Sequence, residues 1–204
     1  MSPKLYLTYL LACIVIATVP GPTVTLIIAN SLTHGTRAGL LNVIGTQLGL
    51  GLMLAIVAIG LASIIATMGW WFDWVRLAGA AYLVWLGWKL LRASGAHSAP
   101  GRAPTPRGGF VLQGFLVMLS NPKALLLFGA FIPQFVDVQG NYVGQVALLG
   151  ATAMAVALVS DGIYAILSGR ANQLLSRQRV RLISRLSGAC LIGGGVWLAL
   201  TRAR

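Results

Sequence analysis

Two proline-centred motifs interrupt long apolar stretches of the sequence, and they suggest chemistry more strongly than any other feature. Pro20-Gly21-Pro22 stands in the first apolar stretch, and Asn121-Pro122-Lys123 stands in the fourth. A proline inside a helix removes a backbone hydrogen bond and clashes with the preceding turn, at a cost of about 3 kcal/mol. Each motif therefore predicts a broken helix. In hydrocarbon such a break persists only where protein or water satisfies the freed carbonyls.

Each break also carries the residue types that begin a new helix. Gly21 and Asn121 are suited to cap a segment whose first residue is the proline that follows. The start of a helix presents free N–H groups and a partial positive charge, which suit an anion such as a carboxylate. The alternative is that each proline merely kinks a packed helix. The candidate substrate-binding residues are Pro20, Gly21, Pro22, Thr23, Asn121, Pro122 and Lys123.

Asp161 is a carboxylate inside the fifth apolar stretch. An aspartate at such a position costs about 2.5–3.5 kcal/mol on insertion scales, so it should face the helix bundle or a water-filled cavity. Ala157 and Ala165 lie one helical turn away on either side and allow close approach. Three roles stay open for Asp161: binding the coupling proton, holding a substrate ammonium group, or pairing permanently with Lys123.

Lys123 and three further polar residues accompany these sites. Lys123 is the cation that lies well inside an expected span, and it could assist the half-helix in binding a carboxylate. Tyr164 falls on the same side of its helix as Asp161 and could donate a hydrogen bond to it. Asn42 and Gln47 could line a pathway, although hydrogen bonding between helices explains them equally well.

Enzymatic constellations are missing from the sequence. There is no paired-histidine zinc motif, no Walker loop and no Gly-x-Ser-x-Gly elbow. His34 and His97 both fall in expected loops, and Asp161 is the one of three carboxylates inside an apolar stretch. We therefore expect no catalytic activity, no metal site and no cofactor. Without a Walker loop, any transport by this chain would depend on an ion gradient.

The elements that position these residues follow from composition. Apolar residues make up 57% of the 204 residues and charged residues 9%, too few to wet the surface of a soluble domain. The net charge of +12 comes from basic residues in the gaps between apolar stretches, so a nucleic-acid partner is not expected. The sequence predicts an all-α integral membrane protein of about six transmembrane helices. Their expected ranges are 5–29, 40–67, 72–91, 110–132, 143–168 and 182–201.

Residues 93–109, rich in Ala, Ser, Pro, Gly and Arg, predict a flexible cytoplasmic linker between two three-helix halves, 1–92 and 110–204. Because three is an odd number, a duplicated half would insert with inverted topology. The two breaks occupy the first helix of each half, and such a matched pair points to a transporter's binding site. Basic residues concentrate in the odd-numbered loops, which predicts that both chain termini lie outside the cell.

These residues carry a resemblance to the LysE/RhtB family of bacterial amino-acid exporters. It includes Pro20-Gly21-Pro22, the approach to the second helix from His34 to Leu40, and the third-helix stretch from Gly79 to Gly87. Asn121-Pro122-Lys123-Ala124 and Pro133-Gln134-Phe135 resemble the family's fourth-helix signature. The resemblance runs the full length of the chain and is least specific in the linker and the last helix.

The resemblance implies a multi-pass efflux protein of the bacterial cytoplasmic (inner) membrane, driven by the proton motive force. Family substrates include threonine, homoserine and its lactone, leucine, lysine and arginine. A cationic substrate would favour more acidic residues than Asp161 alone, so we expect a neutral amino acid or a close derivative. The expected partners are this substrate, protons and membrane lipids, with a homo-oligomer left open. Two alternatives are an exporter of a cation, metal or drug-like solute, and a non-transporting membrane scaffold.

Overall fold

The computed structural model describes residues 2–58, 74, 77–92, 105–127, 131–137, 140–171 and 177–200. Within these ranges the chain is helical and contains no strand, which confirms the expected all-α class. A further helical segment covers 77–92. The labelled elements are α1 (Pro3–Thr18), α2 (Pro22–His34), α3 (Thr36–Ala58), α5 (Gly109–Leu119), α6 (Pro122–Leu126), the 3-10 turn η2 (Ile132–Phe135), α7 (Tyr142–Ala171) and α8 (Arg177–Leu200).

Two described helices, α3 and α7, are by length and composition able to cross a membrane alone. A third span results when α1 and α2 are taken together as one helix bent by 47° at the Pro20 break. The expected fourth helix is divided at Asn121 into α5 and α6, and each piece is too short to span. Most of the expected linker, 93–104, and the end of the expected second helix, 59–67, lie outside the described residues.

Local sequence explains where α1 and α2 begin and end. The Ser2 hydroxyl caps α1 by accepting from the Leu5 N–H, 3.3 Å away. The helix stops at Thr18 because Pro20 has no N–H to donate to the carbonyl four residues back. Helix α2 then begins at Pro22 and ends at His34, and it is capped by Gly35, whose φ of 88° is a conformation that glycine adopts readily.

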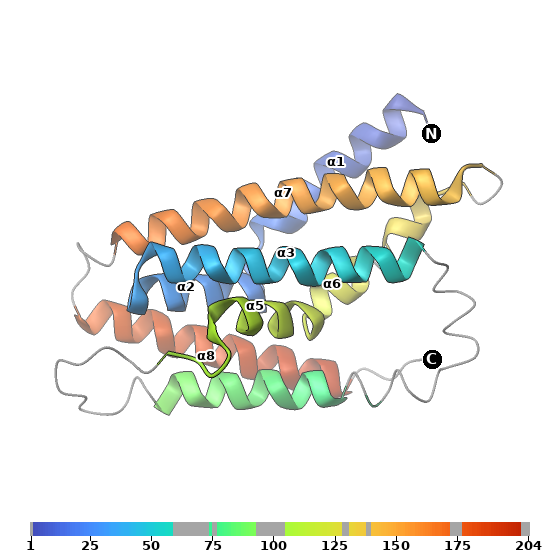
Figure 1. Ribbon diagram of the computed structural model, residues 1–204. Coiled ribbons are helices and arrows are strands. Elements are labelled where there is room, and N and C mark those ends of the chain that lie inside the picture. The colour runs from blue at the N-terminus through green and yellow to red at the C-terminus, as the bar shows by residue number, and fades with distance from the viewer. Residues whose placement is uncertain are drawn as a thin grey trace.

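Helix α3 lies at the centre of the described bundle, in contact with α2, α5 and α7 (Figure 1). Helix α2 packs on α3, α7 and α8, and α1 crosses α7 obliquely (Figure 1). The segment 77–92 packs on α8, where Gly87 and Gly188 bring the two backbones together. The break after α5 is buried at Ser120 and Asn121, whereas Thr18, Val19 and Pro20 at the break after α1 are exposed.

Large apolar side chains on the outer faces of the helices are exposed, as expected of surfaces that meet lipid. In a soluble protein such a continuous apolar surface would drive aggregation. Examples on three helices are Leu7, Leu11 and Val15 of α1, Ile44 and Leu48 of α3, and Leu158, Val159 and Leu167 of α7.

Basic side chains gather at one end of the bundle. The α2–α3 turn and the end of α7 lie at the left of Figure 1, where Arg37 and Arg170 are exposed. Lys4, at the start of α1, lies at the opposite end. This distribution is the one used to predict orientation, and the direction in which the bundle crosses the membrane stays a prediction.

Two glycines allow α3 and α5 to pack backbone against backbone. A Cβ atom at Gly45 would overlap the Val111 carbonyl oxygen, and one at Gly114 would overlap the Asn42 carbonyl oxygen. Gly45 and Gly114 therefore serve the close packing of α3 on α5. At Gly51, on another face of α3, the nearest heavy atom to an added Cβ is Met154 Cε at 3.7 Å, an ordinary contact.

We expect Gly45→Ala to destabilise the protein by about 1–3 kcal/mol, because the new methyl group forces α3 and α5 apart. Gly51→Ala is the matched control on the same helix. It should be neutral or stabilising by up to about 1 kcal/mol, since alanine favours the helix. Thermal unfolding of both variants in detergent measures the difference. Equal unfolding temperatures for the two would contradict this packing.

Candidate functional site

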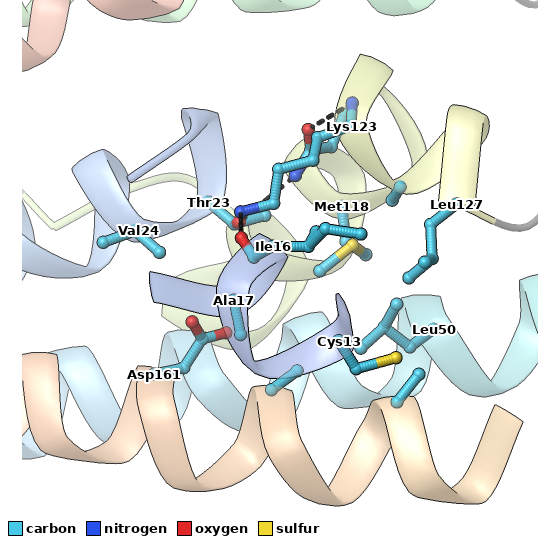
Figure 2. Close-up of a pocket in the computed structure, with 14 residues that line it drawn as sticks. Cys13, Ile16, Ala17, Thr23, Val24, Leu50, Met118, Lys123, Leu127 and Asp161 are labelled. Carbon is cyan, nitrogen blue, oxygen red and sulfur yellow. Dashed lines mark hydrogen bonds between the residues drawn. The ribbon is translucent and has the colours of Figure 1, made fainter. Parts of the chain in front are cut away.

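A small cavity of about 60 Å³ lies where the two helix breaks meet (Figure 2). Side chains from α1, α2, α3, α5, α6 and α7 line it, so it draws on both expected halves of the chain. Four of the candidate residues lie on its wall: Thr23, Asn121, Lys123 and Asp161. The sequence thus identified residues that the fold brings together from positions more than a hundred residues apart.

The two breaks touch through buried side chains. Asn121 Nδ2 donates to Thr23 Oγ1 at 3.2 Å, which joins the start of α6 to the start of α2. Asn121 Oδ1 accepts from the Lys123 N–H at 3.0 Å, and Pro122 is the first residue of α6. Gly21 occupies the N-cap of α2, and Pro22 is its first residue. The helix starts expected at both motifs are confirmed.

The two helix starts differ in which backbone N–H groups they leave without a side-chain partner. The N-cap of α2 is a glycine, so no side chain satisfies its first turn, and both Thr23 and Val24 of that turn line the cavity. In α6, which has five residues, the N–H of Lys123 is already bonded by Asn121. The start of α2 is therefore the one able to accept an anion.

The carbonyls freed at the end of α1 are satisfied by side chains of α6 and α7. Lys123 Nζ donates to Ile16 O and to Val19 O, each at 2.7 Å. The Ser160 hydroxyl donates to Ala17 O at 3.2 Å, and the Tyr164 hydroxyl donates to Thr18 O at 3.1 Å. Pro20 and Pro22 are the residues whose missing N–H groups leave Ile16 O and Thr18 O without helical partners.

This arrangement corrects two expectations. Tyr164 does not bond to Asp161, because its hydroxyl reaches the end of α1. The ammonium of Lys123 is likewise occupied by the two α1 carbonyls, so the direct bond to Asp161 does not form, although each group senses the other's charge. Ser160 was missed in the sequence. A hydroxyl one residue before Asp161, on the helix facing a proline break, was the available signal.

Asp161 projects from α7 into the cavity, opposite Lys123 of α6 (Figure 2). It is 5% exposed. Its polar neighbour on α3 is Thr46, whose hydroxyl can donate to the carboxylate or to Val43 O, 2.8 Å away. A buried carboxylate that contacts a cavity can exchange its partner for a cation or a proton.

Asn42 and Gln47 do not line this cavity. Asn42 belongs to a buried amide cluster in which Asn30 Nδ2 donates to Asn42 Oδ1 at 2.7 Å and to Gln113 Oε1 at 2.9 Å. Asn42 Nδ2 donates in turn to Phe110 O at 2.7 Å. The cluster joins α2, α3 and α5 roughly 10 Å along α2 from Thr23. Gln47 Nε2 is buried without a hydrogen-bond partner.

An aromatic cluster lies near the cavity, one helical turn along α1 from Cys13. Tyr9 of α1 packs on Phe131 and Phe135, with ring centroids 5.7 and 5.1 Å apart, and its hydroxyl donates to Leu149 O at 2.9 Å. Cys13, one helical turn after Tyr9, lines the cavity. A volume of about 60 Å³ holds roughly two water molecules, so an amino acid enters only when the cavity widens.

We expect Lys123→Met to lower the unfolding free energy by about 1–3 kcal/mol, because two carbonyls at the end of α1 lose their donor. Lys4→Met, an exposed lysine in the first turn of the same helix, is the control and should change little. Thermal unfolding in detergent measures both. If Lys123→Met and Lys4→Met unfold at the same temperature, the Lys123 ammonium does not stabilise the break.

Comparison with known proteins assigns the chain to a family. A homoserine/homoserine lactone efflux protein of Salmonella typhimurium is 30% identical over 204 residues, 99% of each chain. A leucine efflux protein of Salmonella choleraesuis is 34% identical over 168 residues, 80% of this chain and 78% of the relative. An uncharacterized membrane protein of Vibrio cholerae is 31% identical over the full length of both chains. No solved structure matches. The chain is a multi-pass protein of the bacterial inner membrane. Because the family profile of LysE type translocators matches residues 14–202, it belongs to the LysE type translocator family.

Proposed function

We propose that this protein exports a neutral amino acid across the inner membrane in exchange for protons. The observation that carries the proposal is the pairing, on one cavity, of an uncapped helix start at Thr23 and Val24 with the buried carboxylate of Asp161. An amino acid is a zwitterion, and these two features match its two charges. Relatives named as homoserine/homoserine lactone and leucine efflux proteins support the same class of cargo.

In the binding mode that we propose, the substrate carboxylate accepts hydrogen bonds from the N–H groups of Thr23 and Val24. The positive end of α2 adds to this attraction. The substrate ammonium takes the place of a proton on Asp161, so the carboxylate carries one positive partner at a time. Competition of this kind couples the outward movement of substrate to the inward movement of protons.

Charge at the site favours a neutral amino acid over a cationic one. Among the described residues, Asp161 is the one carboxylate that lines this cavity. Lys123 also lines it and places an ammonium group near the substrate. A second positive charge on a lysine or arginine substrate would meet repulsion from Lys123, with no further carboxylate on the wall to offset it.

The movement that we propose has two inverted halves, each of three membrane-crossing helices, rocking about the cavity. The break between α1 and α2 bends the chain by 47° and supplies a natural pivot. Parting the amide cluster of Asn30, Asn42 and Gln113 opens one side, and parting the aromatic cluster of Tyr9 opens the other.

Export of a metal ion is the weaker alternative. Cys13 lines the cavity, but no group of three His, Cys, Asp or Glu residues within the described ranges could hold a metal. A drug-like cargo or a non-transporting scaffold makes a different prediction, since neither requires that unlabelled amino acids exchange with labelled ones.

Counterflow in proteoliposomes tests the function directly. Vesicles are loaded with one unlabelled amino acid at a time, and uptake of labelled leucine or homoserine is followed. We expect accumulation with neutral amino acids and none with lysine or arginine. The absence of exchange for every amino acid, in protein whose unfolding transition shows that it is folded, would overturn the proposal.

We expect Asp161→Asn to reduce proton-driven efflux about tenfold or more, because asparagine cannot carry the proton or neutralise the ammonium. Asp137→Asn is the control, since Asp137 is exposed and does not line the cavity. The measurement is efflux from loaded vesicles after a pH gradient is imposed. Efflux of Asp161→Asn at the control's rate would remove Asp161 from the coupling step.

A further inference from the structure

We propose that the cavity selects amino acids with aliphatic side chains over those with hydroxylated ones, and that Cys13 is a specificity-determining residue for this choice. The inference rests on the proposed function, because it assumes that the carboxylate and ammonium occupy the polar side of the cavity. Beyond the proposed function, the inference names the residues that contact the substrate's side chain. That wall distinguishes leucine-like from homoserine-like cargo.

The two sides of the cavity differ in chemistry (Figure 2). Thr23, Asn121 and Asp161 supply the polar groups of one side. Cys13 of α1, Leu50 of α3 and Met118 of α5 also line the cavity, and in Figure 2 Cys13 and Leu50 lie apart from the Asp161 carboxylate, with Ala17 between them. A substrate bound by its charged groups at the polar side therefore extends its side chain towards the apolar side.

The apolar side offers no strong partner for a substrate hydroxyl. The thiol of Cys13 is a weak hydrogen-bonding group, and the nearby Tyr9 hydroxyl gives its own proton to Leu149 O at 2.9 Å. The sulfur of Met118 is a weak acceptor. A hydroxyl placed here would lose its hydrogen bonds to water without replacement, whereas an aliphatic group would only leave water. Discrimination of this kind by an apolar pocket amounts to roughly 10- to 100-fold.

Helix α7 sets the depth of the same wall. Ala153 is buried and Ala157 lies one turn further along, and both line the cavity. Their small side chains leave the space into which an aliphatic substrate must fit. A larger residue at Ala153 should therefore reject leucine more than alanine, which gives a second variant that tests the wall without changing its polarity.

The test compares competition by leucine, valine, threonine and homoserine in counterflow, run separately with labelled leucine and labelled homoserine. For the unmodified protein we expect leucine to compete at a concentration at least tenfold lower than homoserine. Cys13→Ser supplies a hydroxyl at the wall and should narrow this gap by about three- to tenfold. Cys190→Ser, an exposed cysteine of α8, is the matched control and should leave the gap unchanged.

The outcomes separate the two proposals. If amino acids exchange but homoserine competes as well as leucine, the proposed function stands and the selection inference is overturned. An unchanged gap in Cys13→Ser also overturns it. If Cys13→Ser does not fold, Ala153→Val decides, because it should weaken leucine at least threefold relative to alanine, and equal effects on both overturn the inference. If no amino acid exchanges in folded protein, the proposed function itself fails.

Discussion

Every feature of the site depends on one constraint, that backbone polar groups away from water must find partners within the protein. The prolines at positions 20 and 22 leave carbonyls at the end of α1 without helical donors. Lys123, Ser160 and Tyr164 supply those donors from α6 and α7. The break can therefore persist within the bent pair of α1 and α2, and the helices that secure it are the ones that also carry the second break and Asp161.

The same constraint makes the two ends of the break chemically unequal. The carbonyl end of α1 is closed by side-chain donors, while the amide end of α2 begins at Gly21 and has no side-chain cap. An uncapped helix start at a cavity favours an anion, and a carboxylate on the opposite wall favours a cation. A zwitterion satisfies both features together. Lys123, which the sequence suggested as a substrate ligand, instead holds the backbone that shapes the site.

The sequence was most informative where one residue type has one physical consequence. Prolines with a preceding Gly21 or Asn121 predicted both helix starts, and a carboxylate in an apolar stretch predicted burial at a cavity. It was least informative where a polar side chain could choose among partners from other helices. Tyr164 shares a helix with Asp161 but bonds to Thr18, and Asn42 joins Asn30 and Gln113, because helix rotation and bend are set by tertiary packing. The interruption of the fourth apolar stretch at Asn121 was expected, and α5 and α6 lie on either side of it.

The two clusters whose parting we propose differ in what their opening exposes, and this bears on the direction of transport. Parting the amide cluster exchanges hydrogen bonds between Asn30, Asn42 and Gln113 for hydrogen bonds to water, a nearly balanced change. Parting Tyr9 from Phe131 and Phe135 exposes apolar area, which is unfavourable in water. The amide side should therefore open more readily in the absence of substrate. It lies towards the basic end of the bundle, which the positive-inside rule assigns to the cytoplasm. A carrier that opens more readily to the cytoplasm loads its cargo there, as export requires.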